Sequence, residues 1–329
     1  MSLAKFWGHD ECPAFQLGKP RFDQSTFVGR WLHFVDVIDP RTLLTSRAKL
    51  EESLRILDDF KKGRRRDVSD NDLWEAQKIK QAIIHPDTGE KIFAPFRMSG
   101  FVPYGWPFVV GMLLPNPTMT SIVVWQWLNQ SHNAFVNYAN RNATQENPIG
   151  RFIMSYFGAV STAVGISTSL TVLNRRSTTF HPTTKLLLQR VIPVPAVAAA
   201  SSCNALLMRF HELREGIEVY DKDGGVLGVS YVAARRAVRD TVLTRATLAM
   251  GCMLLPALTM PIVERQWPFR KNARIRLVGQ AGVCIASFAF ALPLALALFT
   301  QEATMLASDA EEHIRRKTAD SHVFYNKGL

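Results

Sequence analysis

Cysteine is scarce in this sequence, and charge is missing from its middle. Only 4 of the 329 residues are cysteine, and their spacing fits neither a disulfide framework nor a zinc site. The first 20 residues lack the apolar core of a signal peptide, so no cleavable targeting signal is predicted. The sequence shows no nucleophile–base pair, metal-ligand set or cofactor loop, so we expect neither an enzyme nor a bound metal or cofactor.

The missing charge is the most informative absence. Residues 98 to 140, a stretch of about 43, contain no Asp, Glu, Lys or Arg, although 20% of the chain is charged. A soluble helix of this length would carry charges, and a helix facing only lipid would carry few amides. The many amides of this stretch therefore indicate a wet, protein-lined cavity inside a bilayer.

Five uncharged segments approach the length of a membrane-spanning helix, for which the bilayer core requires about 20 mostly apolar residues. They cover residues 98–114, 152–174, 191–208, 246–263 and 277–301. Residues 1–97 instead hold 17 basic and 15 acidic side chains, which is a soluble composition. We expect an all-α, multi-pass membrane protein: a soluble helical region at 1–97, a bundle of about five proline-interrupted spans at 98–301 with a loop at 209–245, and a tail at 302–329.

The basic residues of the short loops predict the orientation, because such loops stay on the inner side of a membrane. With five spans, the N-terminal region shares one side with the loops after the second and fourth spans, which are rich in Arg and Lys. The N-terminal region is therefore expected inside and the C-terminus outside. An additional half-span at 119–138 would return the tail to the N-terminal side.

The soluble region contains signals for helices and for a turn. Thr45 or Ser46 can cap a helix that ends at Gly63, and Ser69 with Asp72 opens a second helix. The next motif is predicted to be a turn that docks the soluble region onto the membrane body, rather than a metal site, because its proline and glycine favour a turn. It consists of His85, Pro86, Asp87, Thr88, Gly89, Glu90 and Lys91. Farther along, residues 221–225 are predicted to form a hairpin turn.

Polar side chains recur every three or four residues along the uncharged stretch, which gives a predicted helix one polar stripe. Amides can donate to carboxylates and accept from ammonium groups without the desolvation cost of a buried charge. The alternative is that these amides only hold helices together. The candidate substrate-binding residues are Gln126, Asn129, Gln130, His132, Asn133, Asn137, Asn140 and Arg141, of which the last can pair with a carboxylate.

Four strings of residues resemble signatures of the sideroflexins. They are residues 85–91, 125–134, 136–142 and 325–329, and the likeness extends from about residue 15 over essentially the whole chain. His132, Ala139 and the run at 77–83 are more similar to the fifth animal paralogue than to the serine-carrying paralogues. The chain is thus identified as a member of this family by resemblance.

The resemblance implies a transporter of the mitochondrial inner membrane with its N-terminus in the matrix and, by the five-span count, its C-terminus in the intermembrane space. The expected substrate is a serine-like amino acid, or citrate or another tricarboxylate. The expected partners are this small molecule and membrane lipid, not nucleic acid. A non-transporting scaffold or assembly factor is the alternative. The sequence also holds a glycosylation sequon at Asn142, and a glycan there would contradict the mitochondrial location.

Overall fold

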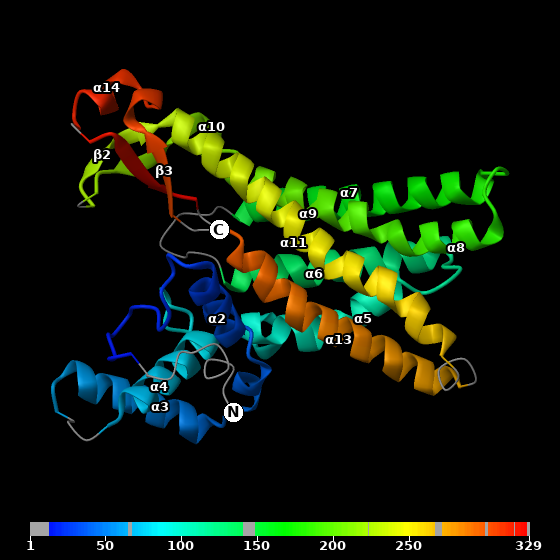
Figure 1. Cartoon of the computed structure of the whole chain (residues 1–329), viewed down its shortest axis with the longest axis horizontal. Helices are drawn as coiled ribbons and strands as arrows, with labels where there is room; N and C mark the ends of the chain where they lie inside the picture. Colours follow the sequence, from blue (N-terminus) through cyan, green and yellow to red (C-terminus); the bar gives the residue numbers. More distant parts are fainter. Residues whose placement is uncertain are drawn as a thin grey trace. The chain divides into compact units, whose positions relative to one another are not determined.

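The structure is a computed structural model that describes residues 13–64, 68–140, 149–222, 224–266, 272–299, 302–318 and 320–327. The chain divides into two compact units, whose elements are labelled in Figure 1. The first unit comprises the chain up to Trp106 and a segment that begins at His132. The second unit comprises residues 107–131 and the chain from residue 149 onward.

The described part of the first unit that precedes residue 101 is helical, as predicted. It contains α2 (Phe27–Val37), α3 (Arg47–Lys61) and α4 (Asp70–Ile83), with the short 3-10 helices η1 (Pro40–Leu44), η2 (Ala94–Phe96) and η3 (Met98–Gly100). Helices α3 and α4 pack against each other through a core of Phe15, Leu57, Leu73 and Trp74. Burial of these large side chains removes apolar surface from water and stabilises the pair.

Both predicted helix caps are confirmed. The Ser46 hydroxyl accepts a hydrogen bond from the Lys49 N–H at the start of α3, and Gly63 follows its end with a φ of 67°. The Ser69 hydroxyl accepts from the Asp72 N–H and donates to the Asp72 carboxylate at 2.7 Å. These bonds satisfy backbone donors that the first helical turn leaves unpaired.

Long helices dominate the second unit. They are α7 (Ile149–Arg176), α8 (Pro182–Val191), α9 (Pro193–Arg209), α11 (Tyr231–Arg265) and α13 (Ala273–Ala297), while α5 (Phe101–Met112) and α6 (Met119–Ala139) belong partly to each unit. Helix α9 packs against α7 and α11, and α11 also packs against α13 (Figure 1). Small buried side chains at Ala159, Ala163 and Ala200 allow α7 and α9 to approach closely.

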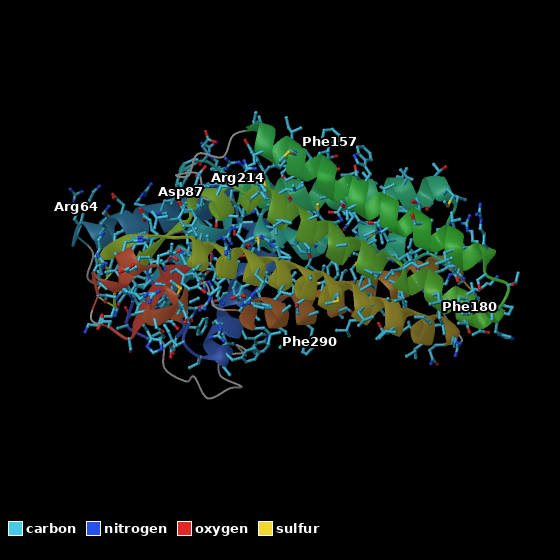
Figure 2. All side chains as sticks on the ribbon, turned by 90° about the horizontal axis from the view of Figure 1, so that it is seen from above. Arg64, Asp87, Phe157, Phe180, Arg214 and Phe290 are labelled. Atoms are coloured by element: carbon cyan, nitrogen blue, oxygen red, sulfur yellow. The ribbon has the colours of Figure 1, made fainter. Side chains whose placement is uncertain are left out.

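Four helical stretches of the described residues are long and apolar enough to cross a membrane: Ile149–Arg176, Pro182–Arg209, Tyr231–Arg265 and Arg274–Ala297. They contain the predicted spans 152–174, 191–208 and 246–263 in full and residues 277–297 of the span predicted at 277–301. Residues 298 and 299 follow the end of that helix, and residues 300 and 301 lie outside the described residues. Large apolar side chains point away from these helices, and Phe157 and Phe290 are 61% and 57% exposed (Figure 2). Such side chains suit contact with lipid.

The predicted first span at 98–114 needs a correction. Helix α5 has 12 residues, which at 1.5 Å per residue gives about 18 Å, less than the bilayer core of about 30 Å. A 3-10 turn at η3 precedes it, and Pro115 and Pro117 follow it. Proline cannot donate the next helical hydrogen bond and disfavours helix in the residue before it, so the helix ends early.

A small sheet combines two strands that precede α11 with two that follow α13. Strands β1 (Ile217–Tyr220) and β2 (Val226–Ser230) form the predicted hairpin, and β3 (Glu302–Leu306) and β4 (His322–Asn326) join it in the antiparallel order β2-β1-β4-β3. Together with η4 (Ala307–Asp309), α14 (Glu312–Arg315) and the first turns of α11, these strands form the sheet module. Its core includes Val219, Ile314 and Val323, none of which is exposed.

The sheet module changes two of the predicted regions without changing the fold class. The predicted loop at 209–245 contains helix α10 (Glu212–Glu215), the hairpin and the beginning of α11. The predicted tail at 302–329 supplies two strands of the sheet. The chain is nevertheless predominantly helical, so the predicted class is confirmed.

Candidate functional site

Helix α6 carries the predicted stripe of polar side chains. Gln126, Asn129, Gln130 and His132 are buried. Asn133 and Asn137 are half-buried, whereas Asn140 is exposed just beyond the end of the helix. The stripe therefore faces protein along most of its length. Arg141, the predicted carboxylate partner, lies outside the described residues.

Gln126 lines a small, partly open cavity of the second unit. Its side chain is 1% exposed, and its Nε2 donates to the Ser167 hydroxyl of α7 at 2.7 Å. The cavity measures about 20 Å³, which is room for about one water molecule. Its polar lining consists of uncharged side chains, namely Ser121, Gln126, Ser167, Thr171 and Gln189.

Three amide atoms of α6 are buried without a hydrogen-bond partner among the described residues. They are the Gln126 Oε1, the Asn129 Nδ2 and the Gln130 Nε2. A buried polar atom left unpaired costs roughly 1–3 kcal/mol, so native proteins keep few of them unless water, an ion or a ligand supplies the partner. Between them these amides offer one acceptor and two donor groups to such a guest.

The other end of the stripe is bound to backbone, within the first unit. The His132 Nε2 lies 3.2 Å from the Pro95 carbonyl oxygen, and the imidazole ring packs in a tilted orientation against the Phe101 ring. The Asn140 Nδ2 donates to the carbonyls of Phe96 and Val136 at 2.8 and 2.7 Å. These two residues hold the helix in place, as in the alternative interpretation of the stripe, and the predicted site is therefore divided.

Proline shapes the cavity on its α8–α9 side. The two helices are separated only at Ile192, and both Ile192 and Pro193 line the cavity. Because Pro193 has no N–H, the carbonyl of Gln189 lacks its usual helical donor four residues on. Backbone groups freed in this way are how discontinuous membrane helices contact a substrate.

Sequence reasoning missed the hydroxyl side of the cavity. On α7, small or hydroxyl side chains recur every four residues and are all buried: Ser155, Ala159, Ala163, Ser167 and Thr171. This spacing places them on one helical face. The pattern could have been recognised in the sequence as the face that meets the amides of α6.

Sequence reasoning also missed a buried ion pair between two helices, to which a third helix is hydrogen-bonded. Arg190 of α8 forms a two-pronged ion pair with Glu264 of α11, and the side chains are 9% and 16% exposed. The Gln280 Nε2 of α13 donates to the same carboxylate at 2.5 Å. Arg190 and Glu264 lie just outside the uncharged segments 191–208 and 246–263, but the helices extend beyond those segments and include both charges. Charges buried between membrane helices are a mark of function or of a specific helix arrangement.

Residues 85–91 form a turn, and its predicted docking onto the membrane body stays a prediction. The His85 N–H donates to the Glu90 carbonyl at 2.8 Å, and Gly89 has a φ of 69°. The His85 Nδ1 accepts hydrogen bonds from the N–H groups of Asp87 and Thr88 at 3.2 and 3.3 Å. The imidazole therefore braces the turn. Across the described residues, no three His, Cys, Asp or Glu side chains gather closely enough to hold a metal ion.

Comparisons with known proteins agree on one family. A family model for sideroflexins matches residues 16–329. The chain is 52% identical to Sideroflexin-5 of Homo sapiens over 320 residues, covering 97% of this chain and 94% of that protein. It is also 52% identical to Sideroflexin-5 of Caenorhabditis elegans, covering 98% of each chain, and 36% identical to Sideroflexin-1 of Homo sapiens, covering 96% and 98%. No solved structure matches the chain.

Proposed function

Because the chain belongs to the sideroflexin family, we propose that it is a secondary transporter of small metabolites in the mitochondrial inner membrane. One observation carries the proposal: Gln126 is buried beside a cavity among helices that can cross a membrane, and its carbonyl oxygen has no partner among the described residues. A bundle held together by amides alone would satisfy this atom. A transport path would leave this oxygen available to accept a hydrogen bond from a passing solute.

The uncharged lining of the cavity favours a serine-like amino acid over citrate. An amino acid is a zwitterion without net charge, and its ammonium and carboxylate groups match the acceptor and donors of α6. Citrate carries up to three carboxylates, and burying them requires cations that offset their desolvation. With room for about one water molecule, the cavity has to widen before either substrate enters.

We also propose that both ends of the chain lie on the same side of the membrane. Helix α6 runs antiparallel to α7, since Gln126 bonds to Ser167 while Ser131 lies 2.9 Å from the Tyr156 hydroxyl. The segment after Ser131 belongs with the N-terminal region, so the α5–α6 hairpin enters the bilayer and returns. The four spans that follow are even in number. The tail then shares the side of the N-terminal region, in place of the opposite side that five spans predicted.

Transport is tested by uptake of labelled serine and labelled citrate into liposomes that contain the purified protein. We expect saturable serine uptake by the wild type and loss of uptake in Gln126→Ala. The matched control is Asn140→Ala, which removes another amide next to the same helix but one that bonds to backbone carbonyls. Because Asn140 is outside the proposed path, this variant should retain uptake in proportion to its folded fraction.

A scaffold or assembly factor would give a different result. In that case folded wild-type protein transports neither compound, and Gln126→Ala changes only the amount of protein in the membrane. Citrate uptake without serine uptake, lost in Gln126→Ala, would retain the path and overturn the choice of substrate.

A further inference from the structure

The sheet module borders a second cavity that no part of the proposed transport path explains. This second cavity is a depression that is widely open to solvent; it measures about 620 Å³ and shares no lining residue with the cavity at Gln126. Helix α11 supplies Arg236, Arg239 and Asp240, while β3, β4 and the residue after β4 supply Thr304, Tyr325 and Lys327. We infer that this cavity is a binding site for a phosphate-bearing anion.

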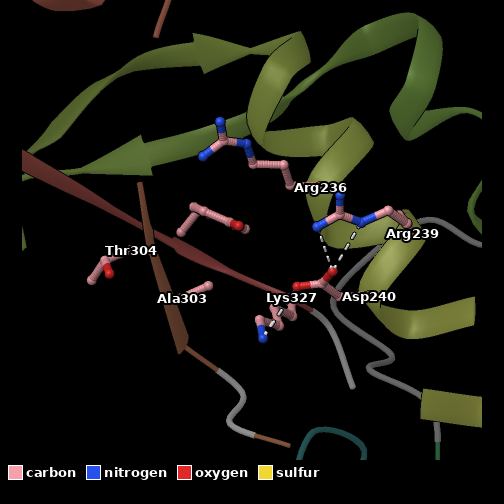
Figure 3. Close-up of a pocket in the computed structure, with 7 residues that line it drawn as sticks. Arg236, Arg239, Asp240, Ala303, Thr304 and Lys327 are labelled. Carbon is pink, nitrogen blue, oxygen red and sulfur yellow. Dashed lines mark hydrogen bonds and ion pairs between the residues drawn. The ribbon is translucent and has the colours of Figure 1, made fainter. Parts of the chain in front are cut away.

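The lining has an excess of positive charge. Three cationic side chains and one carboxylate border the cavity. That carboxylate, Asp240, is shared between Arg239 at 3.1 Å and Lys327 at 3.3 Å (Figure 3). Arg236 pairs at 2.7 Å with Asp309, which does not line the cavity. A single carboxylate cannot neutralise two cations, so the cavity attracts an anion.

The chemistry of the lining fits phosphate in particular. A guanidinium group presents a planar fork of donors that binds two phosphate oxygens at once, and a lysine adds a point charge. The hydroxyls of Thr304 and Tyr325 can donate to further oxygens. Burial, followed by the charge of Asp240, raises the pKa of Tyr325, so that its hydroxyl remains a neutral donor. The volume lies within the range of about 300–1,000 Å³ of small-molecule sites, which exceeds what a lone phosphate ion needs.

The position of the cavity along α11 admits two sources of phosphate. Residues 236–240 precede Arg245, the last charge before the apolar part of the helix, by five to nine positions. At 1.5 Å per residue this is about 8–14 Å, just beyond the head-group layer of a bilayer. Both a phospholipid head group and a soluble phosphate compound can reach this depth.

The test compares the purified full-length protein with two double variants. Arg236→Gln with Arg239→Gln removes two cations of the cavity. Arg235→Gln with Arg316→Gln removes two exposed arginines that do not line the cavity. Arg235 lies on α11, and Arg316 directly follows α14. Binding of pyrophosphate is measured by calorimetry in neutral detergent. Thermal unfolding is measured in nanodiscs of phosphatidylcholine with and without phosphatidic acid.

We expect the wild type and the exposed double variant to bind pyrophosphate with affinities within about twofold of each other. The cavity double variant should bind at least about tenfold more weakly, because it loses two of the three cationic side chains that line the cavity. Arg239→Lys, which keeps the charge, should recover part of the affinity.

Two outcomes distinguish the sources, and two others overturn the inference. Pyrophosphate binding that is lost only in the cavity variant indicates a soluble phosphate compound. A rise of the unfolding temperature with phosphatidic acid, lost only in that variant, indicates a lipid head group. The inference is wrong if neither probe acts on folded wild-type protein, or if both double variants lose the effect equally.

Discussion

At the scale of single residues, the polar side chains between the helices have two kinds of role. His132 and Asn140 are bonded to backbone carbonyls, whereas atoms of Gln126, Asn129 and Gln130 have no partner among the described residues. The first kind fixes a helix, and the second kind is available to a guest. The spacing along the sequence is the same for both, so it could predict the stripe but not its division.

The ion pair between Arg190 and Glu264 gives a prediction about stability. Replacement of one partner of a buried pair leaves the other charge without compensation, so we expect Glu264→Ala to lower the free energy of unfolding by about 3 kcal/mol. The double variant Arg190→Met with Glu264→Leu should lie closer to the wild type, because it leaves no unpaired charge. Thermal and denaturant unfolding in detergent measure both effects.

An exposed pair provides the control for this prediction. Arg316 and Glu312 are 76% and 73% exposed, and Glu312→Ala should change stability little because solvent screens the pair. Equal losses in Glu264→Ala and Glu312→Ala would show that burial does not determine the strength of the interaction.

At the scale of elements, the helix caps of the soluble region were predictable because they depend on neighbouring residues alone. Ser69→Ala removes the acceptor for the Asp72 N–H at the start of α4. We expect a loss of about 1 kcal/mol in the free energy of unfolding, measured by circular dichroism of the full chain. Ser69→Thr retains a hydroxyl and should retain most of the stability, and a larger loss in Thr than in Ala would contradict the capping role.

The start of α11 gives a prediction about pH. Glu311 accepts hydrogen bonds from the N–H groups of Tyr231 and Val232 at 2.8 and 3.1 Å. Partial burial raises the pKa of Glu311, but hydrogen bonds from Ser230 and from these N–H groups outweigh it and hold the pKa below its usual value. A lowered pKa contributes stability that is complete above the unfolded value of about 4.3 and is lost as pH falls through the folded value.

The stability of the sheet module should therefore decline below about pH 4, and Glu311→Gln should weaken this decline. Hydrogen exchange of the β1–β2 amides as a function of pH measures the effect. Glu312→Gln, one residue farther along and exposed, is the matched control. An unchanged pH profile in Glu311→Gln would show that other groups control the module.

At the scale of the whole molecule, topology gives the sharpest prediction. Tags placed at the N-terminus and at the loop after β3 should show the same protease sensitivity in mitoplasts, which are mitochondria without their outer membrane. The family resemblance predicts that both are protected in the matrix. Arg175 and Arg176 end α7, and Arg274 and Arg276 lie in the first turn of α13, at the ends of these helices opposite the sheet module. The rule for basic loops therefore predicts that both tags are cleaved. Opposite results at the two tags would contradict the shared side.

Long-range pairing explains what the sequence could not reveal at this scale. Four spans were visible because an uncharged run is a property of consecutive residues. Helix α6 is not among these four stretches, since its amides lower its hydropathy, and the hydrogen bond from Gln126 to Ser167 of α7 could not be read from the sequence. The sheet was hidden because Tyr220 pairs with Phe324, and α11 and α13 intervene between the two. No local pattern encodes such a contact.

This pairing has a consequence for how the protein is made. Strands β1 and β2 leave the ribosome before α11 and α13, and they can meet β4 only after both helices have crossed the bilayer. If α13 failed to insert, β3 and β4 would be stranded across the membrane, and β1 would keep an open edge beside an uncovered Val219. The complete sheet can therefore form only in a chain in which α13 has inserted, because only then do β1 and β4 lie on the same side of the membrane.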